Sequence, residues 1–192
     1  MMVGMRGPAD GEGALDAALA ARLRDATNAA ARERRIRPVL LIDGRAGAGK
    51  TTLARAVAAA WPAAALVHLE DVYPGWDGLD AASVAVAEEI LGPPAAYTSW
   101  DWAASAPGAR RTVPREGPLI VEGVGALSRA SRALAAYAVW LEVDAATRRR
   151  RAIARDGETF APHWERWAAQ EDALRRREGP ERLADEVLRP AG

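Results

Sequence analysis

The chain has 192 residues, 26 basic and 26 acidic side chains, and no cysteine. Its length fits one domain with its own core, and its zero net charge offers no general basic surface for nucleic acid or an anionic membrane. The absence of thiols excludes disulfides, thiolate nucleophiles and thiolate zinc sites. We therefore expect a protein that recognises a small partner at one dominant site.

The N-terminal segment MMVGMRGPADGEG has no apolar core of signal-peptide length, and nowhere do 18 apolar residues follow one another. The sequence is therefore typical of a soluble cytoplasmic protein. We expect residues 1–13 to form a disordered tail and residues 14–192 to form a single domain, because no linker or internal repeat interrupts them.

Residues 14–35 combine apolar and charged side chains at helical spacing, and Leu15, Leu19 and Leu23 form an apolar stripe. This pattern predicts an amphipathic helix that packs against the rest of the domain.

Four short apolar runs are predicted to be buried strands: 38–43, 64–70, 118–123 and 137–143. Helices are predicted over 50–60, 80–91 and 127–135, followed by a long Arg-rich helix from residue 145. The segment LADEVL (183–188) is short enough for a fifth strand, and a helical turn fits nearly as well. Because strands alternate with helices, we predict an α/β fold whose parallel sheet is covered on both faces.

The segment IDGRAGAGKTT (42–52) connects the first predicted strand to the helix after it. It matches G-x-x-x-x-G-K-[ST], and this strand–loop–helix context is the one that the phosphate-binding motif requires. Glycines let successive backbone N–H groups turn toward a phosphate, and the helix directs its positive end to the same anion. The residues predicted to bind ATP are Gly44, Ala46, Gly47, Ala48, Gly49, Lys50, Thr51 and Thr52.

Lys50 is the only lysine among the 26 basic residues. A compact ammonium on a flexible stem fits beside the phosphates, whereas a guanidinium is wider and rigid. We therefore predict that Lys50 reaches the β- and γ-phosphates of ATP and that the Thr51 hydroxyl binds Mg²⁺.

Two classes of P-loop protein do not fit the remaining pattern. Switch GTPases read guanine through an N-K-x-D motif, which this chain cannot contain because its only lysine is Lys50. RecA-like and AAA motors usually need a longer chain and end their second acidic motif in Asp, whereas the third apolar run here ends in Glu122. Small-molecule kinases remain as the main class.

Four stretches, spread over most of residues 38–190, resemble the uridine kinase and nicotinamide riboside kinase branch of the P-loop kinases: IDGRAGAGKTTLA, LEDVYPGW, LIVEGV and TRRRRAIARD. The resemblance implies a P-loop NTPase fold with three α/β/α layers, a five-stranded parallel sheet whose last strand is ADEVL, and an Arg-rich lid. It also implies that Glu122 lies near the metal and that the lid contacts phosphate through Arg151 and Arg155.

The acidic pair Glu70 and Asp71 ends the second predicted strand, at the sheet edge where ligands bind in open α/β folds. Phosphoryl transfer needs a carboxylate that accepts the proton of the substrate hydroxyl. The spacing to Tyr73 selects Glu70 as the counterpart of the family's acid, whereas side-chain type selects Asp71, and we favour Glu70. The predicted catalytic residues are Lys50, Glu70, Asp71, Arg151 and Arg155, and the predicted metal-binding residues are Thr51 and Glu122.

Three of the seven tryptophans fall in predicted loops near the acidic pair, where a flat substrate could stack on them. The predicted acceptor site comprises Tyr73, Trp76, Trp100, Asp101 and Trp102. Trp164 and Trp167, on the helix after the lid, are interpreted as packing residues, and His68 as a hydrogen-bonded core histidine.

The expected function is transfer of the γ-phosphate of ATP, with Mg²⁺, to a hydroxyl of a small nucleoside-like or sugar-like metabolite. Uridine kinases carry a base-contacting His where SWDWAASAPGARR has Ser105, so the resemblance does not define the acceptor. A nucleoside monophosphate kinase is the nearest alternative, and a non-catalytic nucleotide-binding regulator is the other. ATP and a small-molecule acceptor are the expected partners, without nucleic acid or a membrane.

Overall fold

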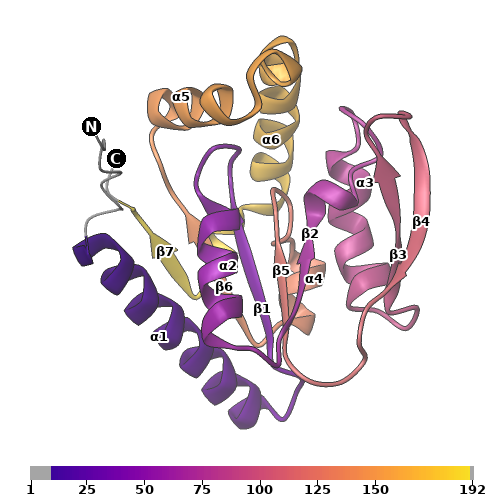
Figure 1. The fold of residues 1–192 in the computed structure, drawn as a ribbon. Coiled ribbons are helices and arrows are strands. Elements are labelled where there is room, and N and C mark those ends of the chain that lie inside the picture. The colour runs from indigo at the N-terminus through magenta and orange to yellow at the C-terminus, as the bar shows by residue number, and fades with distance from the viewer. Residues whose placement is uncertain (1–9, 191–192) are drawn as a thin grey trace, which may run out of the picture.

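A computed structural model of the chain describes residues 10–190. These residues form three layers, in which a sheet lies between two layers of helices (Figure 1). The sheet has the strand order β2-β5-β1-β6-β7, and all neighbouring strands are parallel. Its strands are β1 (Val39–Gly44), β2 (Ala65–His68), β5 (Leu119–Glu122), β6 (Tyr137–Leu141) and β7 (Glu186–Leu188). The predicted five-stranded parallel sheet is thus confirmed.

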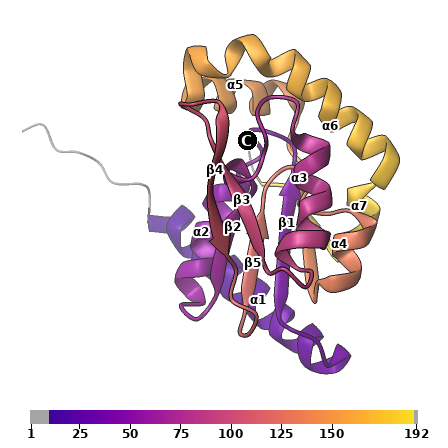
Figure 2. The same cartoon turned by 90° about the vertical axis from the view of Figure 1, so that its right-hand side faces the viewer.

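Helices cover both faces of this sheet. One face carries α1 (Asp10–Arg34) and α2 (Lys50–Ala60), and the other carries α3 (Leu79–Ala85), α4 (Arg129–Leu134) and α6 (Trp164–Glu178). Figure 2 shows α2 on one side of the sheet and α3, α4 and α6 on the opposite side. The predicted lid helix, α5 (Ala145–Asp156), lies across the carboxyl ends of the strands, above the loop that joins β1 to α2 (Figure 1).

Side-chain alternation in β1 explains why its sequence is continuously apolar. Val39 and Leu41 pack into the cluster that contains α3 and α6, whereas Leu40 and Ile42 pack into the cluster that contains α1 and α2. Successive side chains of a strand point to opposite faces, so a strand covered on both faces has no position for a polar residue exposed to water.

Short elements connect these layers. The helix predicted over 80–91 is α3 followed by a π-helical turn, η2 (Val86–Ile90). The 3₁₀ turn η1 (Leu69–Asp71) follows β2, and the 3₁₀ turns η3 (Gly157–Thr159) and η4 (Ala161–His163) separate α5 from α6. The segment 183–188 is divided between the end of α7 (Pro180–Leu183) and strand β7.

Two features differ from the sequence-based expectation. The first helix begins at Asp10, within the predicted tail, because extending an existing helix costs less than starting one; residues 1–9 lie outside the described part of the chain. An antiparallel hairpin of β3 (Ala96–Asp101) and β4 (Ala106–Thr112) was not predicted, because β4 is almost entirely exposed and has no apolar alternation. Trp100 and Asp101 therefore belong to a strand and not to a loop.

No helix within residues 10–190 is long and apolar enough to cross a membrane.

Candidate active site

The loop between β1 and α2 has the backbone conformation expected of a phosphate loop. Gly47 and Gly49 have φ angles of 79° and 96°, in the left-handed region that side chains disfavour. At Gly47 an added Cβ would also lie 2.2 Å from the carbonyl oxygen of Arg148 on α5. The motif therefore needs glycine at these positions because of backbone conformation and, at Gly47, because of the close approach of the lid helix.

The N-terminus of α2 is available to an anion. Gly49 is its N-cap, and no side chain caps the helix, so its first N–H groups and its positive dipole end face the loop. Lys50 is only 8% exposed, and its ammonium donates a hydrogen bond to the carbonyl oxygen of Arg45 at 3.1 Å. Burial lowers the pKa of Lys50 below its usual value, while the carboxylates of Glu122 and Asp43 act in the opposite direction.

Three side chains meet where β1, β2 and β5 end. The Thr51 hydroxyl donates to Glu122 Oε1 at 3.0 Å, and His68 Nδ1 lies 2.6 Å from the same oxygen. Burial opposes ionisation of Glu122, but the hydrogen bond with His68 and the charge of Lys50 outweigh it, so its pKa lies below the usual value. His68, which sequence reasoning placed in the core, thus holds the carboxylate predicted to lie near the metal.

These groups fit a magnesium ion better than an all-protein metal cage. Among the described residues, no three His, Cys, Asp or Glu side chains converge on one point. Mg²⁺ usually keeps several waters and takes its remaining ligands from a few protein oxygens and the substrate phosphates. The Thr51 hydroxyl and the Glu122 carboxylate, next to the phosphate loop, are oxygen donors of this kind.

A cavity of about 400 Å³ extends from the phosphate loop toward the hairpin. Ala46, Gly47, Lys50 and Arg155 line this cavity, and so does Glu70. Asp71 is exposed and does not line it. One wall is aromatic and consists of Tyr73, Trp76, Trp102, Phe160 and Trp167.

The aromatic wall is built from three separate segments. The ring of Trp76 lies with its centroid 4.9 Å from that of Trp102, at the end of the hairpin, and 5.6 Å from that of Phe160, after the lid. It also stacks on His163 at 4.2 Å. The indole N–H of Trp102 donates to the Glu70 carbonyl oxygen at 3.0 Å, which ties the hairpin to the acidic segment.

Some predicted residues do not reach this cavity, and others were missed. The Trp100 ring packs near Gly75 and borders a different hollow, between the hairpin and α3. The Asp101 carboxylate is exposed and accepts the N–H groups of Ala103 and Ala104, so it caps its own turn. Sequence reasoning did not assign to the site three lining residues from the segment after the lid: Thr159, Phe160 and Trp167.

The lid places cations over the phosphate loop. Arg151 and Arg155 line a second hollow of about 170 Å³ together with residues of the loop and of α2: Gly47, Gly49, Lys50, Thr51 and Thr52. Gly47, Lys50 and Arg155 border both hollows, so the two are adjacent. Arg148, the first arginine of the lid segment, is instead buried and donates to the carbonyl oxygens of Val143 and Ala46.

The loop is also anchored from below by Asp43, a residue that sequence reasoning did not identify. Asp43 is 1% exposed, and its carboxylate accepts backbone N–H groups from Gly44, Gly125 and Leu127. Burial raises its pKa to about 7, against the effect of these three donors. Its carboxyl group joins the start of the phosphate loop to the segment that follows β5.

Comparisons with known proteins bear on the fold. No protein-family model and no curated protein matches the chain. Among solved structures, a possible uridine kinase from Bacillus stearothermophilus is 21% identical with a TM-score of 0.54, and the match covers 87% of this chain and 99% of that one. A proposed fructose transport system kinase from a Silicibacter species is 21% identical with a TM-score of 0.52, covering 96% and 100%. At this identity the likeness shows that the chain shares the fold of these two structures, and nothing finer.

Proposed function

We propose that the protein is an ATP- and Mg²⁺-dependent phosphotransferase that phosphorylates a hydroxyl group of a small metabolite. The observation that carries the proposal is one cavity that is lined by the phosphate loop, Lys50, Glu70 and an aromatic wall. An acceptor on the aromatic wall would present its hydroxyl between a carboxylate and the end of a bound triphosphate.

Each residue then has a defined task. Backbone N–H groups of the phosphate loop, Lys50 and the lid arginines hold and neutralise the phosphates, which is the main requirement of phosphoryl transfer. Glu70 accepts the proton of the acceptor hydroxyl. Thr51 and Glu122 would hold Mg²⁺, which supplies positive charge to the β- and γ-phosphate oxygens when bound. His68 orients the Glu122 carboxylate.

The test is ATP-dependent formation of a phosphorylated product across a panel of small alcohols, followed by mass spectrometry. We expect a phosphate ester and one ADP for each ester formed. In Lys50→Arg, the charge remains, but the wider guanidinium does not fit beside the phosphates, so most of the transfer activity should be lost. Wild-type turnover in Lys50→Arg would contradict the assignment of this lysine.

Two other outcomes would replace the proposal. Transfer only to nucleoside monophosphates would identify a nucleoside monophosphate kinase, which uses the same cradle and an Arg-rich lid. Tight ATP binding without transfer to any acceptor would identify a regulatory nucleotide-binding protein.

A further inference from the structure

We infer that the acceptor is a ring-bearing alcohol with few hydroxyl groups besides the one that reacts, and not a sugar or a nucleoside. This inference rests on the proposed function and concerns the same cavity. It follows from a count of the hydrogen-bond acceptors that the described lining offers to a ligand.

Few side chains on this lining can accept a proton from a ligand hydroxyl. The Glu70 carboxylate is assigned to the reacting hydroxyl. The Tyr73 hydroxyl donates to the Val124 carbonyl oxygen at 2.9 Å, so its own oxygen is one of two remaining side-chain acceptors. Lys50 and Arg155 carry donors only. The Thr159 hydroxyl is the other side-chain acceptor on the lining.

Most backbone carbonyl oxygens on the lining already accept one hydrogen bond, which leaves each of them at most one further lone pair for a ligand. Seven lining residues have a carbonyl oxygen that already accepts a hydrogen bond within the protein: Ala46, Glu70, Tyr73, Trp76, Gly123, Val124 and Phe160. A hydroxyl that is buried without an acceptor for its proton loses the hydrogen bond that it made to water. A flat ring loses no hydrogen bond there and gains contact with the aromatic wall.

Two aromatic alcohols with a single hydroxyl, benzyl alcohol and 3-(hydroxymethyl)pyridine, are compared with two compounds that have several hydroxyls, uridine and fructose. Binding is measured by quenching of tryptophan fluorescence, because Trp76, Trp102 and Trp167 line the cavity. Transfer from ATP is measured by phosphorus NMR. We expect the ring alcohols to bind at least ten-fold more tightly and to form phosphate esters with at least ten-fold higher kcat/KM.

Binding and ester formation test the acceptor and the proposed function separately. Esters formed preferentially on uridine or fructose would leave the proposed function intact and overturn the inference about the acceptor. Tighter binding of the ring alcohols without ester formation in any mixture would support the inference about the cavity and count against the proposed transfer. Equal or weaker binding of the ring alcohols would overturn the inference whatever the transfer result.

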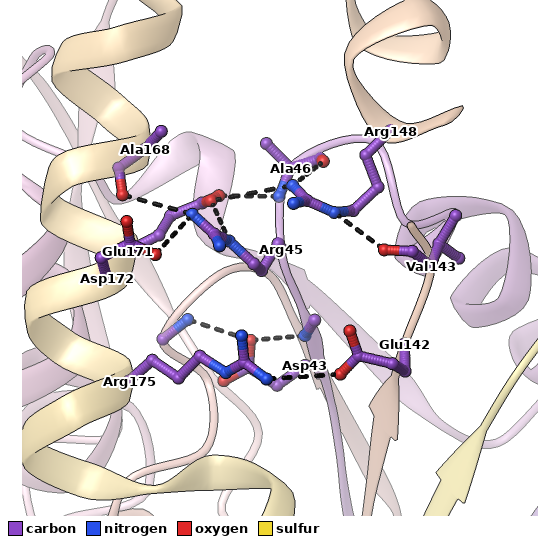
Figure 3. Close-up of polar contacts among 12 residues, drawn as sticks. Asp43, Arg45, Ala46, Glu142, Val143, Arg148, Ala168, Glu171, Asp172 and Arg175 are labelled. Atoms are coloured by element: carbon purple, nitrogen blue, oxygen red, sulfur yellow. Dashed lines mark hydrogen bonds and ion pairs between the residues drawn. The ribbon is translucent and has the colours of Figure 1, made fainter. Parts of the chain in front are cut away.

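A second inference comes from a different observation, the buried contact between α6 and the phosphate loop. We propose that Glu171 is a positioning residue that holds the loop ready for nucleotide. Its side chain is on α6 and the residue is 3% exposed. Its Oε1 accepts the backbone N–H of Ala46 at 2.7 Å, and its Oε2 accepts Nε of Arg45 at 2.8 Å (Figure 3).

The same peptide segment is held from the other side by the lid helix. Arg148, on α5 and 5% exposed, donates to the Ala46 carbonyl oxygen at 3.3 Å and lies 4.0 Å from Glu171. Both polar groups of Ala46 are therefore fixed by charged side chains from two different helices. The Arg45 carbonyl oxygen, one residue earlier, accepts the hydrogen bond of the catalytic lysine candidate, Lys50.

This arrangement defines the orientation of the loop before nucleotide arrives. Charge-assisted hydrogen bonds in a buried site are strong and directional, and a loop that is ordered in advance loses less entropy on binding. In Glu171→Gln, the amide oxygen can accept only one of the two hydrogen bonds, and the amide NH₂ would face a donor. The Arg45–Ala46 segment should then sample orientations that do not bind phosphate.

Asp172 provides the matched control. It lies 2.8 Å from Arg45 Nη2, but its side chain is 47% exposed, and the Ala46 N–H donates to Glu171 instead. Calorimetric titration with MgATP should give at least ten-fold weaker binding in Glu171→Gln and a Kd within two-fold of wild type in Asp172→Asn. Thermal unfolding of the nucleotide-free proteins measures the structural contribution separately.

A wild-type Kd for MgATP in folded Glu171→Gln would overturn the positioning role, even if its melting temperature were lower. An equal loss of affinity in Asp172→Asn would also overturn it, because the effect would then come from general charge near Arg45. If Glu171→Gln does not fold, Glu171→Asp retains the charge but shortens its reach by one methylene, and wild-type affinity in that variant would likewise reject the proposal.

Discussion

Glu70 and Asp71 are adjacent in the sequence, but only Glu70 lines the cavity beside the phosphate loop. We predict that Glu70→Gln lowers kcat by roughly 10²- to 10⁴-fold, the usual range for a positioned acid or base. Asp71→Asn should cost less, because its exposed carboxylate is outside the cavity. Measurement of kcat for both variants at saturating ATP decides between them. A large loss in Asp71→Asn beside near-normal Glu70→Gln would assign the base to Asp71.

Glu122 connects the metal-binding hypothesis to His68. A neutral amide holds a hydrated dication less well than a carboxylate, so Glu122→Gln should raise the Mg²⁺ concentration needed for half-maximal activity. His68→Ala should shift the Mg²⁺ titration in the same direction by less, because Thr51 still donates to the Glu122 carboxylate. An unchanged titration in folded Glu122→Gln would leave this residue with a structural role only.

The two tryptophans of the hairpin, Trp100 and Trp102, lie at different hollows in the structure. Both were predicted from sequence to have the same role, yet Trp102 lines the cavity beside the phosphate loop and Trp100 borders another hollow. Trp102→Ala should raise the acceptor KM by the loss of about 1 kcal/mol of stacking. Trp100→Ala should lower the melting temperature with little change in that KM. The reverse pattern would move the acceptor to the other hollow.

At the scale of elements, an element could be predicted from the sequence where the residues that specify it are close together in the chain. The phosphate loop was predictable because its glycines, lysine and threonine are consecutive and its flanking strand and helix have strong patterns. The buried strands were predictable because burial on both faces leaves a continuous apolar run, as in residues 39–42. The hairpin was not, because its second strand is exposed and has no apolar alternation, and only the start of its first strand, at Tyr97, packs into the core.

Some residues near the cavity were not predicted from the sequence, for a different reason. Phe160 lines the cavity and Glu171 contacts the loop only because the chain after α5 folds back over the loop. Trp167 has the helical spacing of a packing residue, and it is indeed 5% exposed, but the same ring also borders the cavity. No short motif contains both partners of such contacts, so spacing alone cannot reveal them.

The contact between the phosphate loop and α5 can be tested with two glycines of similar backbone conformation. Gly47 has φ 79° and Gly117 has φ 73°, but an added Cβ meets the Arg148 carbonyl oxygen only at Gly47 and meets nothing within 4 Å at Gly117. Urea unfolding should show a loss of about 1 kcal/mol for Gly117→Ala, from the left-handed conformation alone. Gly47→Ala should lose more, on the order of 3 kcal/mol, because α5 must also move. Equal losses would show that the lid helix is not packed tightly on the loop.

At the scale of the whole molecule, one buried carboxyl group, that of Asp43, connects two regions that are distant in sequence. The carboxyl of Asp43 accepts N–H groups from the phosphate loop and from the segment after β5, so its hydrogen bonds form only when β1 and β5 are correctly paired. Its protonation should therefore be coupled to global unfolding, in contrast to that of an exposed carboxylate.

The sign of this coupling follows from the shift of the Asp43 pKa from the ordinary 3.8 to about 7 in the folded protein. Between these values the native state holds a proton that the unfolded chain releases, so the Asp43 contribution to stability is present at low pH and is lost as pH rises to about 7. The slope is at most about 1.4 kcal/mol per pH unit. Asp43→Asn cannot titrate, although its amide NH₂ must face a backbone donor and should destabilise the protein at every pH. The difference in unfolding free energy between wild type and Asp43→Asn, measured in urea from pH 5 to pH 8, should shrink as pH rises to about 7 and then become constant. A difference that is independent of pH would show that Asp43 keeps its charge in the folded protein and that its three backbone donors outweigh its burial.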